Sequence, residues 1–138
     1  MGSLSQFRLD NDKSTEGIWR KFGAGIEVKI ARMHNPDFNK YYEEIRGPHL
    51  SQIRSRSIDM ETSVDLMKRA VARWVIRDWK NLEDEKGKAI KYSPEKAYEI
   101  ISDPANVLFY DFILDVSASV NLFFEEQKEQ AGKNLLDA

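Results

Sequence analysis

The segment "GIWRKFGAGIEVKIARM", residues 17–33, carries the clearest strand pattern in the chain. Its second half, residues 26–31, alternates apolar and charged side chains, which is the two-residue period of a strand with one face in water. The Gly-Ala-Gly in its middle allows a tight reversal, so we expect residues 18–22 to pair with residues 26–31 as a hairpin. Because an isolated hairpin is marginal in water, helices should cover its apolar face.

Helical patterns follow the predicted hairpin. "HNPDFNKYYEEIRGP", residues 34–48, offers Asn35 as an N-cap and Pro36 at the first helical position, and its apolar residues recur at helical spacing. A longer amphipathic helix is predicted from Asp59 to about Trp79. Between these two helices, residues 48–57 lack a strong period and fit either a helical turn or a loop.

The second half of the chain repeats the same start signals. Ser93 and Asp103 are each followed by proline, so each is expected to begin a helix. A charged turn at 84–87 and an Ala-Ile pair, long enough only for an edge strand, precede Ser93. The last helix is predicted as one continuous element over residues 105–130.

These patterns predict a mostly helical α+β fold, in which the N-terminal β-hairpin packs against about four helices. One domain is expected over residues 17–126, because single domains usually contain about 100–150 residues. Residues 1–16 are expected to form a flexible N-terminal arm, and residues 127–138 a flexible C-terminal tail.

Composition argues against several classes of protein. Lys and Arg (21) nearly balance Asp and Glu (23), and the net charge of −2 makes nucleic acid an unlikely main partner. Without cysteine there is no disulfide or thiolate metal site. No apolar run approaches the roughly 18–20 residues that span a bilayer, and no signal peptide is recognisable, so we expect a cytoplasmic protein without a membrane partner.

No residue pattern indicates catalysis, a cofactor or a metal. His34 and His49 lack the close spacing of helical zinc ligands. The glycines at 23 and 25 precede a strand, whereas a phosphate-binding loop precedes a helix. No serine lies in a nucleophile-elbow context. We therefore expect a non-enzymatic protein.

The last predicted helix is apolar well beyond a single stripe. It is either deeply buried or covered by a partner. The residues chosen as a partner-binding or self-association surface are Phe109, Phe112, Phe123 and Phe124. The alternative is that the hairpin and the helices simply cover each other. If the surface exists, Phe112→Asp or Phe124→Asp should abolish partner binding without unfolding the chain.

The predicted central helix carries Asp65, Arg69, Arg73 and Arg77 at four-residue intervals. The preferred interpretation is a solvated ridge in which Asp65 pairs with Arg69. The competing interpretation is a nucleic-acid-binding regulator that uses these arginines, for which salt-sensitive DNA binding would be expected.

One stretch resembles a known family. Trp79, the acidic turn at 84–87, Ile90, Tyr92-Ser93 and a helix opening with Glu95 and Ala97 form the pattern. It resembles tail assembly chaperones of long-tailed (siphovirus-like) bacteriophages. The early hairpin followed by Asn-Pro, the Arg-Asp-Trp at 77–79 and the Lys-Asn pair at 133–134 agree with it, so that the resemblance covers roughly residues 17–136.

The resemblance implies a non-enzymatic helper of virion morphogenesis in the host cytoplasm, absent from the mature virion. Such chaperones bind the long helical tape-measure protein and recruit tail-tube protein, often with a longer frameshifted form. The alternative from another class is a small virion structural protein, such as a tail or head completion component. The family has no catalytic residues to transfer.

Overall fold

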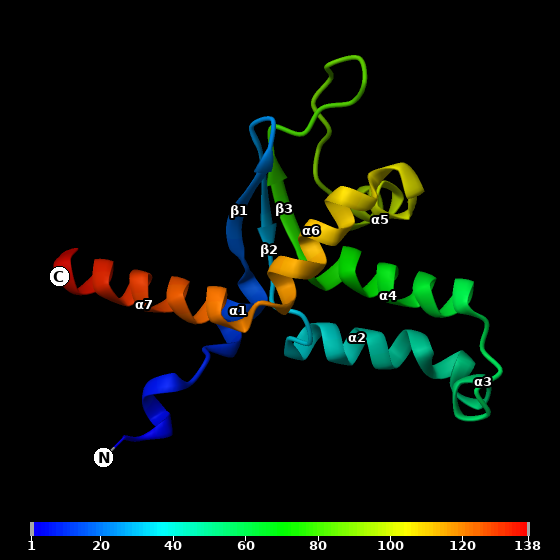
Figure 1. The fold of residues 1–138 in the computed structure, drawn as a ribbon, viewed down its shortest axis with the longest axis horizontal. Helices are drawn as coiled ribbons and strands as arrows, with labels where there is room; N and C mark the ends of the chain where they lie inside the picture. Colours follow the sequence, from blue (N-terminus) through cyan, green and yellow to red (C-terminus); the bar gives the residue numbers. More distant parts are fainter. Residues whose placement is uncertain (1, 138) are drawn as a thin grey trace.

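The computed structural model describes residues 2–137 as a small antiparallel sheet surrounded by helices (Figure 1). The predicted mostly helical α+β class is confirmed. The hairpin is also confirmed: β1 (Ile18–Gly23) pairs with β2 (Ile26–Ile30). Ala24 and Gly25 form the two-residue turn between them, with φ of 53° and 80°. Positive φ at both positions gives the turn the twist that adjoining strands require.

A third strand, β3 (Ile76–Lys80), pairs antiparallel with β2 and gives the order β1-β2-β3. This corrects the prediction of a helix to about Trp79, because α4 (Met60–Trp74) ends five residues earlier. Helical periodicity continues through Val75 and Ile76, but the free edge of β2 offers these residues a ladder of hydrogen bonds. Long-range pairing therefore outweighs the local pattern.

The predicted caps are where the sequence placed them. Asn35 caps α2 (Pro36–Arg46), and Ser93 caps α5 (Pro94–Ser102). Between α2 and α4, most of the ambiguous segment is helical, with a 3-10 turn (Gly47–His49) followed by α3 (Leu50–Arg54), and residues 55–59 form a non-helical connection to α4. The short edge strand expected near Ala89 is only an isolated bridge to Glu83.

The predicted last helix is two helices. After a 3-10 turn (Pro104–Asn106), α6 (Val107–Ala118) ends at Ser119, and α7 (Val120–Asp137) leaves at a bend of 65°. Ser119 has φ −86° and ψ 80°, and its hydroxyl donates to the carbonyl of Asp115. Serine side chains that bond to the backbone in this way favour helix bends. No single helix among the described residues is long and apolar enough to cross a membrane; only the bent pair qualifies, by length and composition alone.

The core joins the sheet to α2, α4, α5, α6 and α7. Val28 and Ile30 of β2 are completely buried, as is Ile113 of α6. Phe22 of β1 contacts both Phe109 and Phe112 of α6, with ring centroids 5.2 Å apart in each pair. The apolar face of the hairpin is therefore covered by the chain's own helix.

The two ends of the chain meet on α7. Residues 2–16 contain a 3-10 turn (Leu4–Phe7) and α1 (Asn11–Glu16), and residues 127–137 continue α7. The Gln127 side chain accepts from the amide of Asp10 at 2.8 Å and donates to the carbonyl of Arg8 at 3.0 Å. Flexibility of the predicted arm and tail stays a prediction; their outermost residues, 1 and 138, lie outside the described chain.

Candidate partner-binding groove

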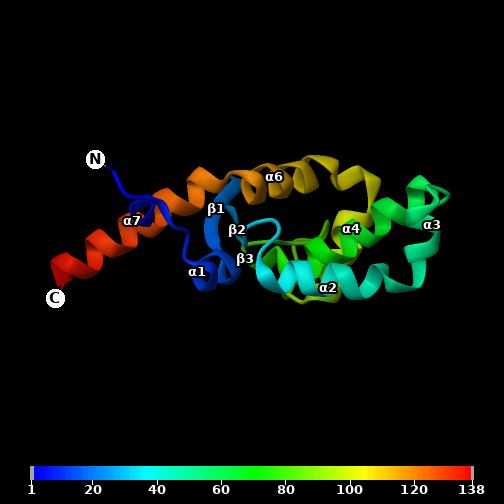
Figure 2. The same ribbon diagram turned by 90° about the horizontal axis from the view of Figure 1, so that it is seen from below.

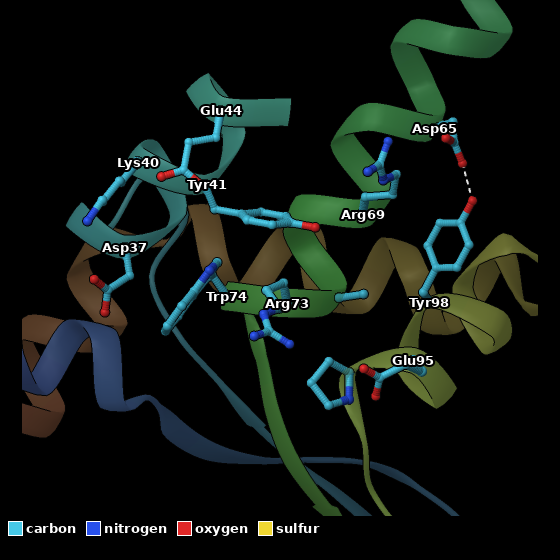
Figure 3. A pocket seen from close by; sticks show the side chains of 12 residues that line it. Asp37, Lys40, Tyr41, Glu44, Asp65, Arg69, Arg73, Trp74, Glu95 and Tyr98 are labelled. Atoms are coloured by element: carbon cyan, nitrogen blue, oxygen red, sulfur yellow. Dashed lines mark hydrogen bonds between the residues drawn. The ribbon is translucent and has the colours of Figure 1, made fainter. Parts of the chain in front are cut away.

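A groove of about 880 Å³ runs across α4 (Figure 3). The helix α2 lies on one side of α4 and α5 on the other (Figure 1). Side chains from all three helices line the groove: Asp37, Lys40, Tyr41 and Glu44 from α2, Asp65, Arg69, Ala72, Arg73 and Trp74 from α4, and Glu95 and Tyr98 from α5. The groove is open to solvent along α4 and mixes charged with aromatic side chains.

Asn35 fixes the position of α2 against α4. Its side-chain oxygen accepts from the Phe38 amide at 2.9 Å and so caps α2. Its Nδ2 donates to the carbonyls of Arg32 at 2.9 Å and Trp74 at 3.0 Å. Trp74 is the last residue of α4, so its carbonyl has no partner further along the helix. One completely buried amide therefore links the start of α2, which forms one wall of the groove, to the end of α4, which forms its floor. The helix α5 forms the other wall.

The other wall is held by Tyr98, whose hydroxyl donates to the carboxylate of Asp65 (Figure 3). This hydrogen bond, followed by partial burial and the negative charge of Asp65, raises the pKa of Tyr98 above its ordinary value. The tyrosine therefore stays neutral and continues to donate throughout the physiological pH range. The expected ion pair between Asp65 and Arg69 is not formed among the described residues; Asp65 accepts from Tyr98 instead.

Two half-buried aromatic side chains lie between the walls. Trp74 occupies the α4 side, where the Arg77 guanidinium stacks over its ring at 4.9 Å from the centroid. Tyr41 extends from α2 toward α4 (Figure 3). Exposed guanidinium groups of Arg69 and Arg73 stand beside these rings, and neither forms an ion pair within the described part of the chain.

Acidic residues surround these cations. Asp37 and Glu44 on α2 and Glu95 on α5 are exposed, and Lys40 is the basic residue on the α2 wall. The groove is thus not a uniformly basic surface, and its field would repel an extended polyanion at the rim. It is better suited to a partner that carries both signs of charge.

The four predicted partner-binding phenylalanines lie outside this groove. Phe109 and Phe123 are buried in the core, with 7% and 4% of their surface exposed. Phe112 and Phe124 are half-buried, and Phe124 stacks on Phe7 at 6.1 Å between ring centroids. Their role in partner binding stays a prediction. The four-residue spacing of Arg69 and Arg73 predicts an exposed basic row, but nothing local in the sequence predicts that α2 and α5 lie on either side of it.

The two histidines make separate local contacts. His34 packs edge-on against Phe38 at 5.5 Å between ring centroids, and His49 lies 3.4 Å from the side-chain oxygen of Gln52. Across residues 2–137, no group of three or more histidines and acidic residues is arranged to hold a metal ion.

A family described as "YdaY prophage protein" matches residues 33–134. The chain belongs to this family. The YdaY match begins just before α2 and includes every residue that lines the groove, whereas the hairpin lies outside it. No curated protein and no solved structure matches the chain significantly. Membership in the YdaY family confirms the bacteriophage origin that the resemblance implied, at the level of a prophage protein.

Proposed function

We propose that this prophage protein is a non-enzymatic chaperone of tail assembly, which binds the tape-measure protein and recruits tail-tube subunits in the host cytoplasm. The observation that carries the proposal is that the residues responsible for the resemblance position α5, which forms one side of the groove, and that one of them, Glu95, lines it. A prophage family is consistent with it but names no role in the tail.

Trp79 and Tyr92 are the centre of that pattern. The Trp79 indole donates to the carbonyl of Ile90 at 2.7 Å, and the Tyr92 hydroxyl donates to the carbonyl of Ile76 at 2.6 Å. The two rings pack edge to face at 5.0 Å. Together these contacts fasten the segment that enters α5 onto β3.

The turn and the cap complete this connection. The carboxylate of Asp84 accepts from the backbone amides of Lys86 and Lys88, each at 2.9 Å. Ser93 then caps α5 by accepting from the Lys96 amide at 3.0 Å. The pattern thus sets where α5 starts and how it lies beside α4. The connection thereby gives the groove its second side, and helix-in-groove docking is a common mode of peptide recognition.

Phe112 and Phe124 support a second contact surface for self-association or for the tube subunit. Their partial exposure leaves apolar area available beside Phe22 and Phe7, which are 36% and 64% exposed. Phe109 and Phe123 would support this surface from the core. Many weakly binding copies along one tape measure would gain strength from multivalency.

The test is capture of partners by the tagged protein from cells that express the prophage tail genes, with mass spectrometry of the bound proteins. Recovery of the tape-measure protein and tube subunits is expected, and Phe124→Asp should reduce tube recovery without changing the circular dichroism spectrum. Presence of the protein in purified particles, without capture of the tape measure, would contradict the proposal in favour of a virion structural protein.

A further inference from the structure

We propose that the groove binds a helical segment with two carboxylates one turn apart, which pair with Arg69 and Arg73. This inference rests on the proposed chaperone function and specifies the chemistry of the segment that the groove accepts. Helices present side chains three or four residues apart on one face, with about 5–6 Å between Cβ atoms. Arg69 and Arg73 have that spacing on α4, so two acidic side chains on a facing helix can reach both.

The two arginines are exposed cations available for pairing. Arg77, which the sequence pattern placed in the same helical row, lies in β3 and is already engaged, because it stacks on Trp74 and donates to the carbonyl of Arg73 at 3.1 Å. Arg69 and Arg73 have no ion pair among the described residues, and both guanidinium groups line the groove. A guanidinium binds a carboxylate through two parallel hydrogen bonds, which gives orientation as well as attraction.

The floor can seat the apolar part of the same helix. Ala72 lies on α4 between Arg69 and Arg73 in the sequence and is buried. It lines the groove with only a methyl group, so a partner backbone can approach α4 closely at this position. Trp74 and Tyr41 offer half-buried aromatic surface beside it. A helix with its side chains is about 10–12 Å across, so a groove of about 880 Å³ holds roughly two turns.

The rim selects against a uniform polyanion. Asp37, Glu44 and Glu95 stand at the groove edges, where they favour basic residues on the flanks of the bound helix. Phosphates along nucleic acid would meet these carboxylates at the same time as the arginines, at a cost in free energy. The charge distribution therefore favours an acidic pair flanked by basic residues over DNA or RNA.

The experiment uses the full-length protein and an array of 20-residue peptides that covers all tail proteins encoded by the prophage. Bound peptides are expected to come from the tape-measure protein and to carry acidic residues at i and i+3 or i+4. The double variant Arg69→Glu, Arg73→Glu should bind them at least about tenfold more weakly. The matched control, Lys13→Glu with Lys21→Glu, makes the same charge change at two exposed positions of α1 and β1 that do not line the groove, and it should bind as the wild type does.

The outcomes separate the inference from the function. Tape-measure peptides that lack an acidic pair, or that bind the Arg69→Glu, Arg73→Glu variant equally well, would overturn the groove assignment and leave the chaperone proposal standing. Acidic-pair peptides from other proteins alone would support the groove assignment and contradict the tape-measure proposal. Absence of any bound peptide would overturn both. Arginine-dependent binding of a 30-base-pair DNA duplex, measured in parallel by gel shift, would overturn the inference in favour of nucleic acid.

Discussion

Replacing Asn35 by alanine should loosen the groove by detaching the start of α2 from the end of α4. The substitution removes the side-chain acceptor that caps α2 and the donor that satisfies the Trp74 carbonyl. The carbonyl of Arg32 keeps its bond from the Asn35 backbone amide at 3.2 Å, so the Trp74 carbonyl alone loses its partner. Because Asn35 is completely buried, water does not replace the lost hydrogen bonds without opening the structure.

Two contributions set the magnitude. Loss of an N-cap costs about 1 kcal/mol, and a buried carbonyl left without a donor costs about 1–3 kcal/mol. The free energy of unfolding should therefore fall by about 2–4 kcal/mol, which for a chain of this size corresponds to a decrease in Tm of roughly 10 °C. Asn35→Ser keeps a good cap but removes the amide donor, so it should lose only the carbonyl part.

The assay is urea and thermal unfolding followed by circular dichroism. Asn39→Ala is the matched control, because Asn39 lies in the same helix, is exposed, and donates to the carbonyl of His34 at 2.9 Å. Its effect should remain within about 0.5 kcal/mol. Equal unfolding midpoints for Asn35→Ala and Asn39→Ala would refute the assignment of this buried amide as the connection between the two helices.

Two further predictions concern the rest of the domain. Gly17→Ala should destabilise the fold by about 1–3 kcal/mol in urea unfolding, because φ is +101° and the added Cβ would lie 3.1 Å from the backbone of Ile30. Gly47→Ala is the control and should not destabilise the fold, because its added Cβ meets no atom within 4 Å. Equal effects of the two substitutions would contradict this explanation. Burial, with a smaller effect of the Asp111 charge, raises the pKa of Tyr110 to about 12. The pKa values of Tyr92 and Tyr98 are also raised, so Tyr110→Phe should remove one component, and not all, of the tyrosinate absorbance at 295 nm that appears late in the titration. Since unfolded tyrosine ionises near pH 10, this stabilising contribution is complete below pH 10 and is lost between pH 10 and about 12.

Local signals in the sequence were sufficient to predict where most helices begin. Asn35 and Ser93 act through atoms no more than three residues away, and a capping residue followed by proline is a short-range pattern. The second role of Asn35, its bond to Trp74, joins positions 39 residues apart and is invisible to such patterns. The sequence did not predict β3 for the same reason. Residues 76–80 form a strand because they pair with β2, which is distant in the sequence, whereas their local pattern continues that of the preceding helix.

The site could be predicted only in part. Arg69 and Arg73 on α4 were predicted to be polar and exposed, because their four-residue spacing is a property of one helix, whereas Arg77 of the same predicted row lies in β3. The walls come from α2 and α5, whose placement depends on tertiary contacts. The phenylalanine stripe posed the opposite problem, since an apolar helix face looks the same whether its own sheet or a partner covers it. Burial of Phe109 and Phe123 shows that the sheet and neighbouring helices cover those two positions.

The direction of α7 limits what a tethered ligand could do. Beyond the contact of Gln127 with Arg8 and Asp10, residues 128–137 continue as helix for about 15 Å, away from α2, α4 and α5 (Figures 1 and 2). A helical extension is a stiff spacer. A short ligand attached to its end cannot reach the groove of the chain that carries it, so its effective concentration at that groove is near zero. A groove-binding peptide fused after α7 would therefore occupy the groove of another copy, and the fusion would form open head-to-tail chains rather than closed monomers.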